Sequence, residues 1–296
     1  MHLAVGMFDG VHLGHRAVLE AAIISARRTG GVAAALTFDP HPSRLLNPAR
    51  AVPLIQPVET KVDRMLMAGL QAVITETFTV EFAAVEAEDF VAHLQAALPA
   101  LKAIYVGENW RFGRGRRGDV KLLIAQAHAA GLQVFSAPRV NFDGEPISST
   151  RIRAALAEGE IDQVNALLGY TYRCSGEVVT GRRLGREFGF PTLNVLWGPE
   201  CQPKFGVYAV KVSVRGGTQI WEGVANYGVR PTVETEAAAP PQLEVHLFET
   251  PDFGTGAVLD VDWCSYLRSE KRFDSVNALR DQITMDRGAA RQWFDG

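Results

Sequence analysis

The apolar residues in the first half of the chain follow two spacings in alternation. Short apolar runs predict buried strands over residues 3–5, 31–38, 72–75, 103–107 and 132–135. Between and after them, apolar residues recur at i, i+3 and i+4, which predicts helices over 14–28, 60–70, 87–98, 118–130 and 151–157. Such an alternation predicts a mostly parallel sheet with helices on both faces. Ligands bind such sheets outside the carboxyl ends of the strands, so the loops after residues 5, 38 and 106 are expected to form a site.

The pattern changes near residue 169. From Tyr170 onward, helical spacing is absent for about a hundred residues. Alternating apolar and polar residues predict strands over 172–179, 206–214, 220–225, 243–249 and 258–266, separated by glycine-rich turns. This pattern predicts a small antiparallel β-barrel, followed by a helix over 274–285. We therefore expect two domains, residues 1–168 and 169–296, with residues 234–241 as a mobile surface loop.

Composition and charge argue against a nucleic-acid-binding, membrane-spanning or secreted protein. The chain has 296 residues and a net charge of −3 without a long basic run, which argues against a nucleic-acid partner. No stretch approaches the roughly 20 apolar residues of a membrane helix, and the N-terminus lacks the pattern of a signal peptide. Its three cysteines, Cys174, Cys201 and Cys264, are widely spaced and do not form the closely spaced pairs of a metal site. They indicate reduced thiols in a cytoplasmic protein, and the sequence does not indicate a homo-oligomer.

Two histidines stand where the first strand gives way to the first helix. Gly6 and Gly10 allow a tight turn there, and His12 and His15 fall at the start of the helix. The unpaired N–H groups of a helix N-terminus attract phosphate. A pair of histidines at this spacing is in general more often solvent-facing or capping than part of a site. The position at a strand-to-helix turn favours a phosphate site.

The stretch from Gly6 to His15 resembles the HxGH signature of nucleotidylyltransferases. These enzymes have a Rossmann-like domain and join the α-phosphate of a nucleotide to an acceptor, releasing pyrophosphate. The resemblance implies that ATP contacts Gly6, Phe8, Asp9, Gly10, His12 and His15. Because an attacking phosphate is already ionised, we expect His12 and His15 to stabilise charge and not to remove a proton.

Three further stretches of the first domain match the same resemblance. Residues 147–153 place hydroxyls at a helix start, which alone fits an ordinary N-cap. This family carries an ISSTxxR motif, which implies ATP contacts from Ser148, Ser149, Thr150 and Arg153. On its composition alone, the loop over 106–119 is interpreted as an exposed arginine-rich loop. It resembles, however, the VGx(D/N)FxFG segment of bacterial FAD synthetases. Residues 37–42 match another segment of the same family. The resemblance implies flavin contacts from His41, Asn109 and Trp110, although Trp110 stands where Phe is usual and His41 could be a simple loop cap.

The start of the second domain carries a glycine at every fourth position from Gly181. Glycine spacing alone fits a turn-rich connection. The segment that follows resembles the GxPTxN motif of riboflavin kinases, with Leu193 where Ala is usual. That resemblance implies ATP contacts from Gly181, Gly185, Gly189, Pro191, Thr192 and Asn194. It also implies that Thr192 and Asn194 hold Mg²⁺, a cation that prefers oxygen ligands.

The strand over 243–249 carries the candidate catalytic residue of the second domain. Leu243, Val245 and Leu247 share one face, which we expect in the core, and Glu244 and His246 share the other. A strand carboxylate is more often solvent-facing, but the riboflavin kinase resemblance makes Glu244 the base for the ribityl 5′-hydroxyl. It also implies flavin contacts from Arg268 and Glu270. Residues 250–257 depart from the family pattern, so no contact is assigned to them.

These motifs follow one another along nearly the whole chain in the order of the bacterial FAD synthetases. That family comprises bifunctional riboflavin kinase/FMN adenylyltransferases. It implies conversion of riboflavin and ATP to FMN and ADP in the barrel, then of FMN and ATP to FAD and pyrophosphate in the first domain, with Mg²⁺ in both. Two other classes remain: a flavin or nucleotide sensor without catalysis, and a kinase whose adenylyltransferase domain prefers another acceptor.

Overall fold

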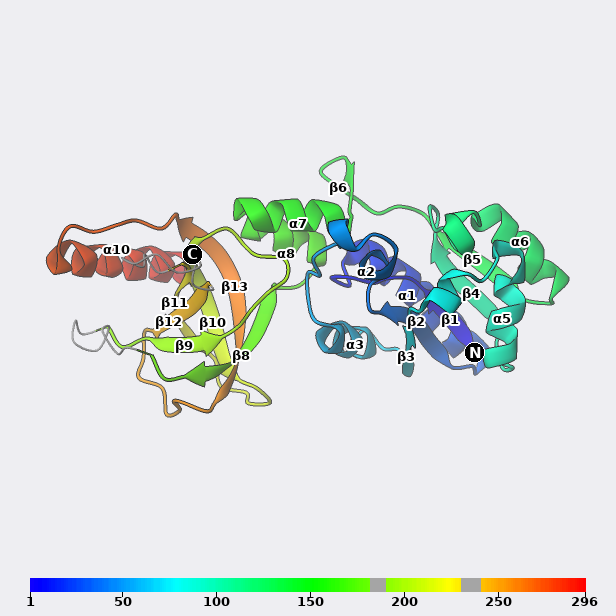
Figure 1. The fold of residues 1–296 in the computed structure, drawn as a ribbon. Helices are drawn as coiled ribbons and strands as arrows, with labels where there is room; N and C mark the ends of the chain where they lie inside the picture. The colour runs from blue at the N-terminus through cyan, green and yellow to red at the C-terminus, as the bar shows by residue number, and fades with distance from the viewer. Residues whose placement is uncertain (182–189, 230–240) are drawn as a thin grey trace. The chain divides into compact units, whose positions relative to one another are not determined.

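The chain folds into two compact units, Met1–Ser149 and Thr150–Gly296, joined within helix α7 (Ser149–Glu158) (Figure 1). The structure is a computed structural model that describes residues 1–181, 190–229 and 241–296. Helix α8 (Ile161–Leu168) belongs to the second unit, where the side chain of Asn165 bonds to the backbone of Trp263 and Tyr172. The domain boundary at 168/169 stays a prediction.

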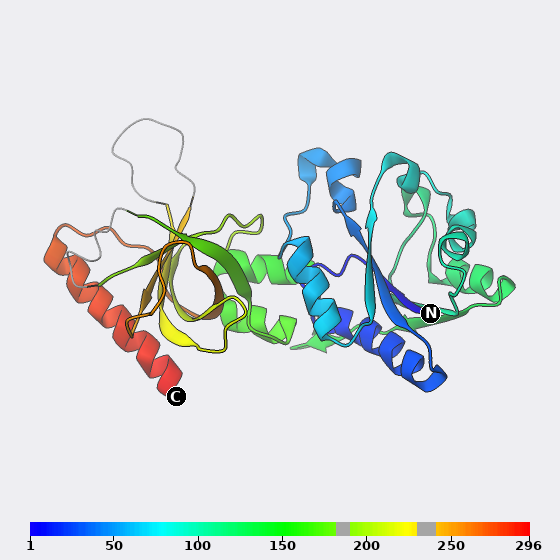
Figure 2. The same cartoon turned by 90° about the horizontal axis from the view of Figure 1, so that it is seen from below.

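The first unit is built on a five-stranded parallel sheet in the order β3-β2-β1-β4-β5 (Figure 2). This confirms the parallel sheet expected from the alternating pattern. Helices α1 and α3 pack on one face, and helices α5 and α6 pack on the other. The strands are β1 (His2–Val5), β2 (Ala33–Asp39), β3 (Ala72–Thr77), β4 (Ala103–Gly107) and β5 (Gln133–Ala137). The helices are α1 (Leu13–Thr29), α3 (Val58–Met67), α5 (Phe90–Ala97) and α6 (Val120–Ala129).

The two faces of this sheet are packed with residues of different size. Leu3 and Val5 of β1 lie in the cluster with α5 and α6, whereas Ala4 lies in the cluster with α1. Ala33 and Ala35 of β2 share the face of Ala4. Small side chains on this face let α1 approach the sheet closely, which brings the N-terminus of α1 over the end of β1.

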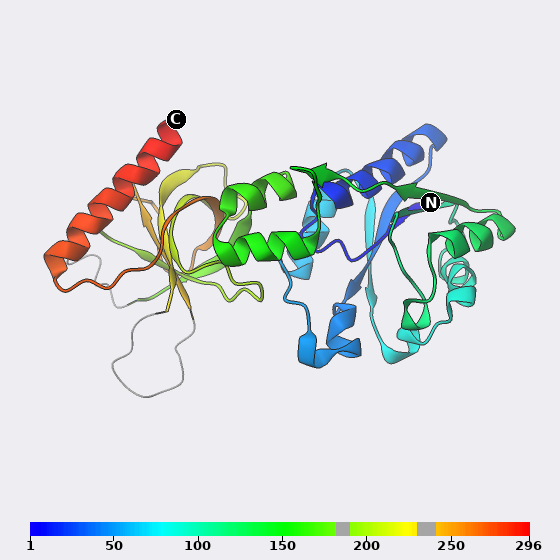
Figure 3. The same cartoon turned by 90° about the horizontal axis from the view of Figure 1, so that it is seen from above.

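The second unit is a closed antiparallel barrel in the order β10-β11-β12-β9-β8-β13 (Figure 3). The barrel and its antiparallel pairing confirm the expectation for this half. Strand β9 was not expected, because the consecutive apolar residues Val195, Leu196 and Trp197 interrupt the alternation of apolar and polar positions. The strands are β8 (Arg173–Val179), β9 (Leu193–Leu196), β10 (Gly206–Val214), β11 (Trp221–Gly228), β12 (Gln242–Leu247) and β13 (Val258–Arg268).

Helix α10 (Val276–Asp295) packs on the outside of the barrel. Ser275 is its N-cap and accepts a hydrogen bond from the backbone N–H of Ala278 at 3.1 Å. The helix runs past the predicted end at Met285. In its last turns, Ala290 is buried and Phe294 packs against the same apolar cluster of the barrel. Except for Pro241, the predicted loop over 234–241 lies outside the described residues.

Several short elements have no counterpart in the sequence prediction. They are α2 (Pro42–Leu46), α4 (Val80–Ala83), the 3₁₀ turns η1 (Pro48–Arg50), η2 (Ala87–Asp89) and η3 (Arg114–Arg116), and the hairpin strands β6 (Asn141–Phe142) and β7 (Glu145–Pro146). Each is too short for a periodic signal. Over the ranges that the structure describes, no helix combines the length and apolar character needed to cross a membrane.

Candidate functional site

The turn between β1 and α1 has an unusual backbone. Phe8, Gly10 and Val11 all adopt positive φ, at 51°, 81° and 35°. Glycine accepts this conformation readily, but Phe8 and Val11 are strained in it. The backbone N–H of Val11 donates to the carbonyl of Phe8 at 3.0 Å, which closes the turn. Strained backbone of this kind concentrates at functional sites.

The two histidines lie together at the N-terminus of α1, as predicted. His12 is the N-cap, and its Nδ1 accepts a hydrogen bond from the backbone N–H of His15 at 3.2 Å. The two rings stack with centroids 3.6 Å apart and an angle of 15°. The edge-to-face contact with Phe8 holds His15 from the other side, at 5.4 Å. Nδ1 of His15 is buried and has no hydrogen-bond partner among the described residues.

Burial lowers the pKa of His15 well below its ordinary value, and the charges of His12 and Lys61 lower it further. His15 is therefore neutral at pH 7. A neutral imidazole can still donate one N–H to a phosphate oxygen.

Acidification is expected to destabilise the first unit through His15. Its pKa is lowered in the folded chain from the ordinary value of 6.5 that it keeps when unfolded. Between the two values the unfolded chain binds more protons, so stability is lost as the pH falls below about 6.5. We expect the thermal midpoint measured by calorimetry to drop between about pH 7.5 and about pH 5.5, and His15→Gln to reduce that drop. An unchanged drop in the variant would contradict this origin.

Lys61 lies beneath the same turn and was missed by the sequence prediction. It is almost fully buried in α3, and its Nζ donates to Oγ1 of Thr37 at 2.9 Å and to the carbonyl of Met7 at 3.3 Å. Burial lowers its pKa, while Asp9 and Asp39 raise it. Lys61 precedes the buried Met65 by one helical turn, and a lysine at such an inward position is the signal that could have revealed it.

Asp9 holds a neighbouring segment in place. Its buried carboxylate accepts a hydrogen bond from the backbone N–H of Ile55, at 3.1 and 3.3 Å from the two oxygens. The backbone carbonyl of Asp9 accepts a bond from Oγ of Ser149 at 2.9 Å. The side chain predicted to contact ATP thus fixes the segment that borders the turn.

The structure brings the start of the ISSTxxR stretch to the histidine turn. Ser149 and Asp9 are 140 positions apart in the sequence and are joined by their hydrogen bond. A Cβ on Gly14 would lie 3.7 Å from the carbonyl of Ile147, so this backbone also passes close to α1. Ser148 precedes α7, whereas Thr150 and Arg153 lie farther along α7 in the second unit.

The residues predicted to contact flavin lie on two other loops at the carboxyl end of the sheet. Trp110 follows β4 and stacks on Phe112 with centroids 4.8 Å apart, while Asn109 beside it is exposed. His41 follows β2 and caps α2, where its Nδ1 accepts from the backbone N–H of Ser43 at 3.1 Å. The strand order reverses between β1 and β4, and such a reversal is where open α/β sheets bind ligands.

In the second unit, three polar residues line up across three strands. Glu244 of β12 is paired with Asn194 of β9 on one side and with Asn226 of β11 on the other. Directly paired residues of antiparallel strands project from the same face. A half-buried carboxylate therefore stands between two carboxamides.

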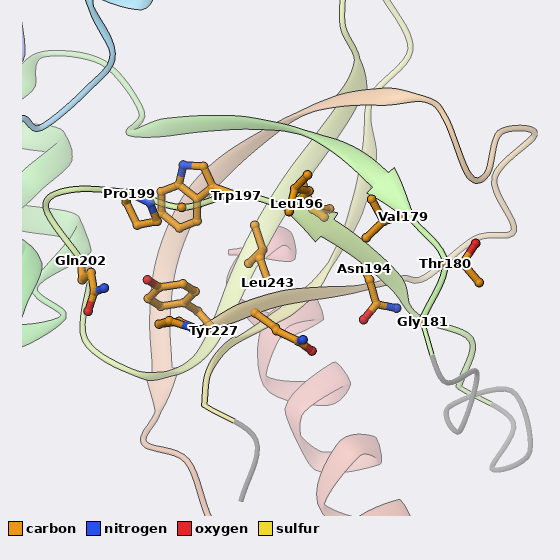
Figure 4. A pocket seen from close by; sticks show the side chains of 14 residues that line it. Val179, Thr180, Gly181, Asn194, Leu196, Trp197, Pro199, Gln202, Tyr227 and Leu243 are labelled. Atoms are coloured by element: carbon orange, nitrogen blue, oxygen red, sulfur yellow. The ribbon is translucent and has the colours of Figure 1, made fainter. Parts of the chain in front are cut away.

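A pocket of about 540 Å³ borders this row. Asn194, Thr180 and Gly181 line one end of it, and Trp197, Pro199 and Tyr227 line the other (Figure 4). A Cβ on Gly181 would overlap the amide of Asn194, so a larger residue at this position would displace that side chain. Gly185 and Gly189, also predicted to contact ATP, lie outside the described residues.

His246 fixes the segment that leads into β9. Its Nδ1 lies 2.9 Å from the carbonyl of Pro191 and bonds to it. Thr192 follows Pro191 directly and precedes β9 by one residue. His246 was expected beside Glu244 on the polar face, yet it is almost fully buried. Burial lowers the pKa of His246, the hydrogen bond to Pro191 raises it, and the charge of Arg287 lowers it; the net shift is downward, so the ring is neutral at pH 7.

The oxygen donors of Thr192 and Asn194 suit Mg²⁺ as a partial ligand set. Mg²⁺ in nucleotide sites usually takes one or two protein ligands and completes its shell with phosphates and water. Within residues 1–181, 190–229 and 241–296, no group of three or more His, Cys, Asp or Glu side chains is placed to hold a metal ion.

Arg268 and Glu270, predicted to contact flavin, have protein partners. Nε and Nη2 of Arg268 donate to the two oxygens of Asp286 in α10, each at 2.7 Å. Glu270 lies against Gly228 and accepts from Nδ2 of Asn226 at 3.5 Å. Arg268 thus joins β13 to α10, and Glu270 extends the row of polar residues.

Arg268→Met is expected to destabilise the second unit by about 3–5 kcal/mol, because it leaves the buried carboxylate of Asp286 without its cation. Denaturant unfolding would measure the change. Arg280→Met, an exposed arginine of α10, is the matched control and should have little effect. The double change Arg268→Met with Asp286→Leu should recover most of the loss, and failure to do so would contradict the ion-pair explanation.

Two family models match the chain: FAD synthetase over residues 1–151 and riboflavin kinase over residues 168–294. A bifunctional riboflavin kinase/FMN adenylyltransferase from Escherichia coli strain K12 is 36% identical over 292 residues, covering 99% of this chain and 92% of the relative. Proteins of the same name from Listeria monocytogenes and Bacillus subtilis are 35% and 33% identical, with the same coverage.

A solved structure covers both units. A crystal structure described as a macrolide-efflux protein from Streptococcus pneumoniae matches with a TM-score of 0.86 and 28% identity, over 98% of this chain and 94% of its own. The two family models follow each other in the order that the motifs predicted, and relatives at 33–36% identity span nearly the full length. The chain therefore belongs to the family of bifunctional riboflavin kinase/FMN adenylyltransferases.

Proposed function

We propose that residues 169–296 transfer the γ-phosphoryl group of ATP to riboflavin, and that residues 1–168 then transfer the AMP group of a second ATP to the FMN formed. The products are ADP and FMN in the first step, and pyrophosphate and FAD in the second. The observation that carries the proposal is the pairing of Glu244 with Asn194 and Asn226 beside the pocket. That arrangement joins a base to oxygen donors suited to a nucleotide–metal complex.

In the kinase step, Glu244 accepts the proton of the ribityl 5′-hydroxyl as its oxygen bonds to the γ-phosphorus. The bond between this phosphorus and the β-bridging oxygen breaks, and ADP leaves. Thr192 and Asn194 would hold Mg²⁺, which neutralises charge on the phosphates when bound. His246 keeps Thr192 in place through Pro191. Gly181, Gly185, Gly189 and Pro191 contact ATP, and Arg268 and Glu270 lie toward the flavin.

In the adenylyltransferase step, a phosphate oxygen of FMN attacks the α-phosphorus of ATP and pyrophosphate leaves. His12 and His15 stabilise the charge on the α-phosphate. No base is needed because the attacking oxygen is ionised. The phosphates are bordered by the turn residues Gly6, Phe8, Asp9 and Gly10, by Ser148, and by the α7 residues Ser149, Thr150 and Arg153. His41, Asn109 and Trp110 lie toward the flavin.

Incubation of the pure protein with riboflavin, ATP and Mg²⁺, followed by separation of the flavins, tests both halves. We expect FMN to appear first and FAD to follow. Absence of FMN would overturn the kinase assignment. Tight flavin binding without turnover would indicate a sensor instead, and FMN formation without FAD would indicate another acceptor for the first domain.

The partners of this chain are small molecules under this proposal: ATP, riboflavin and FMN. We place the protein in the cytoplasm because its three cysteines are free and buried. Burial raises the pKa of Cys174 to about 12, so this thiol stays protonated and unreactive.

A further inference from the structure

The buried ammonium of Lys61 is bonded to three groups around the turn that follows β1. Its Nζ donates to Oγ1 of Thr37 at 2.9 Å, to the carbonyl of Met7 at 3.3 Å and to the carbonyl of Phe38 at 3.4 Å. An ammonium has three N–H donors, and these bonds use all of them. Lys61 therefore acts on a substrate only through the residues that it holds.

The carbonyl of Met7 is held from two elements. Besides the bond from Lys61 of α3, it accepts a hydrogen bond from Oγ1 of Thr37 in β2 at 3.0 Å. Thr37 is fully buried and Lys61 almost fully, and hydrogen bonds away from water are strong and cooperative. Because the hydroxyl of Thr37 accepts from Lys61 and donates to Met7, the three groups form one closed network.

This network supports a strained torsion. The φ angle of Phe8 describes how the Met7–Phe8 peptide group is turned relative to the rest of Phe8, and it is 51°. A phenylalanine at positive φ is strained and keeps this conformation only when its surroundings hold it there. The carbonyl that Lys61 and Thr37 hold belongs to this peptide group, so the two side chains stabilise the strained conformation.

Phe8 in turn holds His15. Its ring is fully buried, and it meets the ring of His15 edge to face, with centroids 5.4 Å apart and an angle of 80°. A Cβ on Gly6 would lie 3.0 Å from the Phe8 ring, so this ring packs closely on the backbone before the turn. The position of His15 therefore depends on the ring of Phe8, and the position of that ring depends on its backbone conformation.

We infer that Lys61 is a positioning residue of the adenylyltransferase reaction. Together with Thr37, it holds the carbonyl of Met7 and so keeps Phe8 in its strained conformation. Phe8 then keeps the imidazole of His15 where charge develops on the α-phosphate, which is where a donor must stand to lower the barrier. This inference rests on the proposed adenylyltransferase function and adds to it a residue that contacts neither nucleotide nor flavin.

Lys61→Met removes the ammonium and keeps the length of the side chain. In FAD formation from added FMN, kcat should fall by about 10- to 100-fold, the range expected when a reacting group is slightly misplaced. The KM for ATP should stay within about twofold, because an interaction that strengthens only in the transition state contributes to kcat. FMN formation from riboflavin should be unchanged, since it uses the other unit. A raised KM with an unchanged kcat would contradict the positioning role.

Thr37→Val tests the same network without changing a charge. Valine has nearly the shape of threonine but lacks the hydroxyl that bonds to both Lys61 and Met7. We expect kcat for FAD formation to fall by about 3- to 10-fold, the effect of one hydrogen bond. Because both side chains act through one carbonyl, the double variant should lose less than the product of the two single losses. Losses that multiply would contradict a shared network. This variant also carries the test if Lys61→Met does not fold, and an unchanged kcat would then overturn the inference.

Tyr105→Phe is the matched control for a general loss of stability in the first unit. Its hydroxyl is 2.8 Å from Nδ1 of His2, at the start of β1 and therefore at the end of the strand away from the turn. The control should lower the thermal midpoint and leave kcat unchanged. In NMR spectra, the ring protons of His15, which the ring current of Phe8 shifts, should move in Lys61→Met and stay in the control.

The outcomes separate this inference from the proposed function. If the wild type forms FAD from FMN but Lys61→Met keeps its kcat, the positioning inference is wrong while the adenylyltransferase assignment stands. The same holds if Tyr105→Phe loses as much kcat as Lys61→Met, because the effect would then follow from stability alone. If the wild type forms no FAD from FMN, the proposed function of the first unit is wrong.

Discussion

Glu244→Gln is expected to lower the rate of FMN formation by about 10²–10⁴-fold, the usual contribution of a positioned general base. Glutamine has the shape of glutamate and can still pair across the strands with Asn194 and Asn226. It cannot take the proton from the ribityl hydroxyl. FAD formation from added FMN should be unchanged, because that reaction uses an ionised nucleophile at the other site. Separate assays with riboflavin and with FMN measure the two rates.

Glu249→Gln is the matched control for this experiment. Glu249 is an exposed glutamate just beyond the end of β12 and is not part of the polar row. It should keep both activities. If Glu244→Gln abolished both steps in a folded protein, or kept full kinase activity, the assignment of the base would be wrong.

Strand β12 shows which features of burial the periodicity of the sequence predicts and which it does not. Leu243, Val245 and Leu247 are buried in the core, as their spacing predicted. His246 was predicted on the polar face, but the segment around Phe190 and Pro191 covers it. That segment is more than fifty positions away in the sequence. Periodicity assigns a residue to a face, but it does not indicate what later packs on that face.

For the candidate sites too, the sequence predicted the position of some residues and missed others. Turn chemistry and a helix start are local signals, so the place of His12 and His15 followed from the sequence. The roles of Lys61 and Asp286 depend on partners from other elements. Lys61 bonds to backbone and side chain from β2 and the β1 turn, and Asp286 bonds to Arg268. No local pattern encodes these contacts, and only the packed structure reveals them.

The two sites also differ in the protonation chemistry that they favour. Glu244 is half-buried between two carboxamides, and we propose that it takes the proton of the ribityl hydroxyl. His15 is enclosed by His12, Phe8 and a nearby buried lysine, all of which favour its neutral form. The kinase reaction must remove a proton from a neutral alcohol, whereas the adenylyltransferase reaction needs none removed. The environments of the two groups match these separate demands.

His15→Ala is expected to lower FAD formation from FMN by about 10²–10³-fold, the usual effect of losing one donor to a charged transition state. The change removes the imidazole that stacks on His12 and the N–H available to the α-phosphate. FMN formation from riboflavin should be unchanged. His128→Ala, an exposed histidine of α6, is the matched control and should keep both steps. A fall in both activities with an intact thermal transition would contradict separate sites. Full FAD formation in His15→Ala would show that His12 and the helix N-terminus suffice for charge stabilisation.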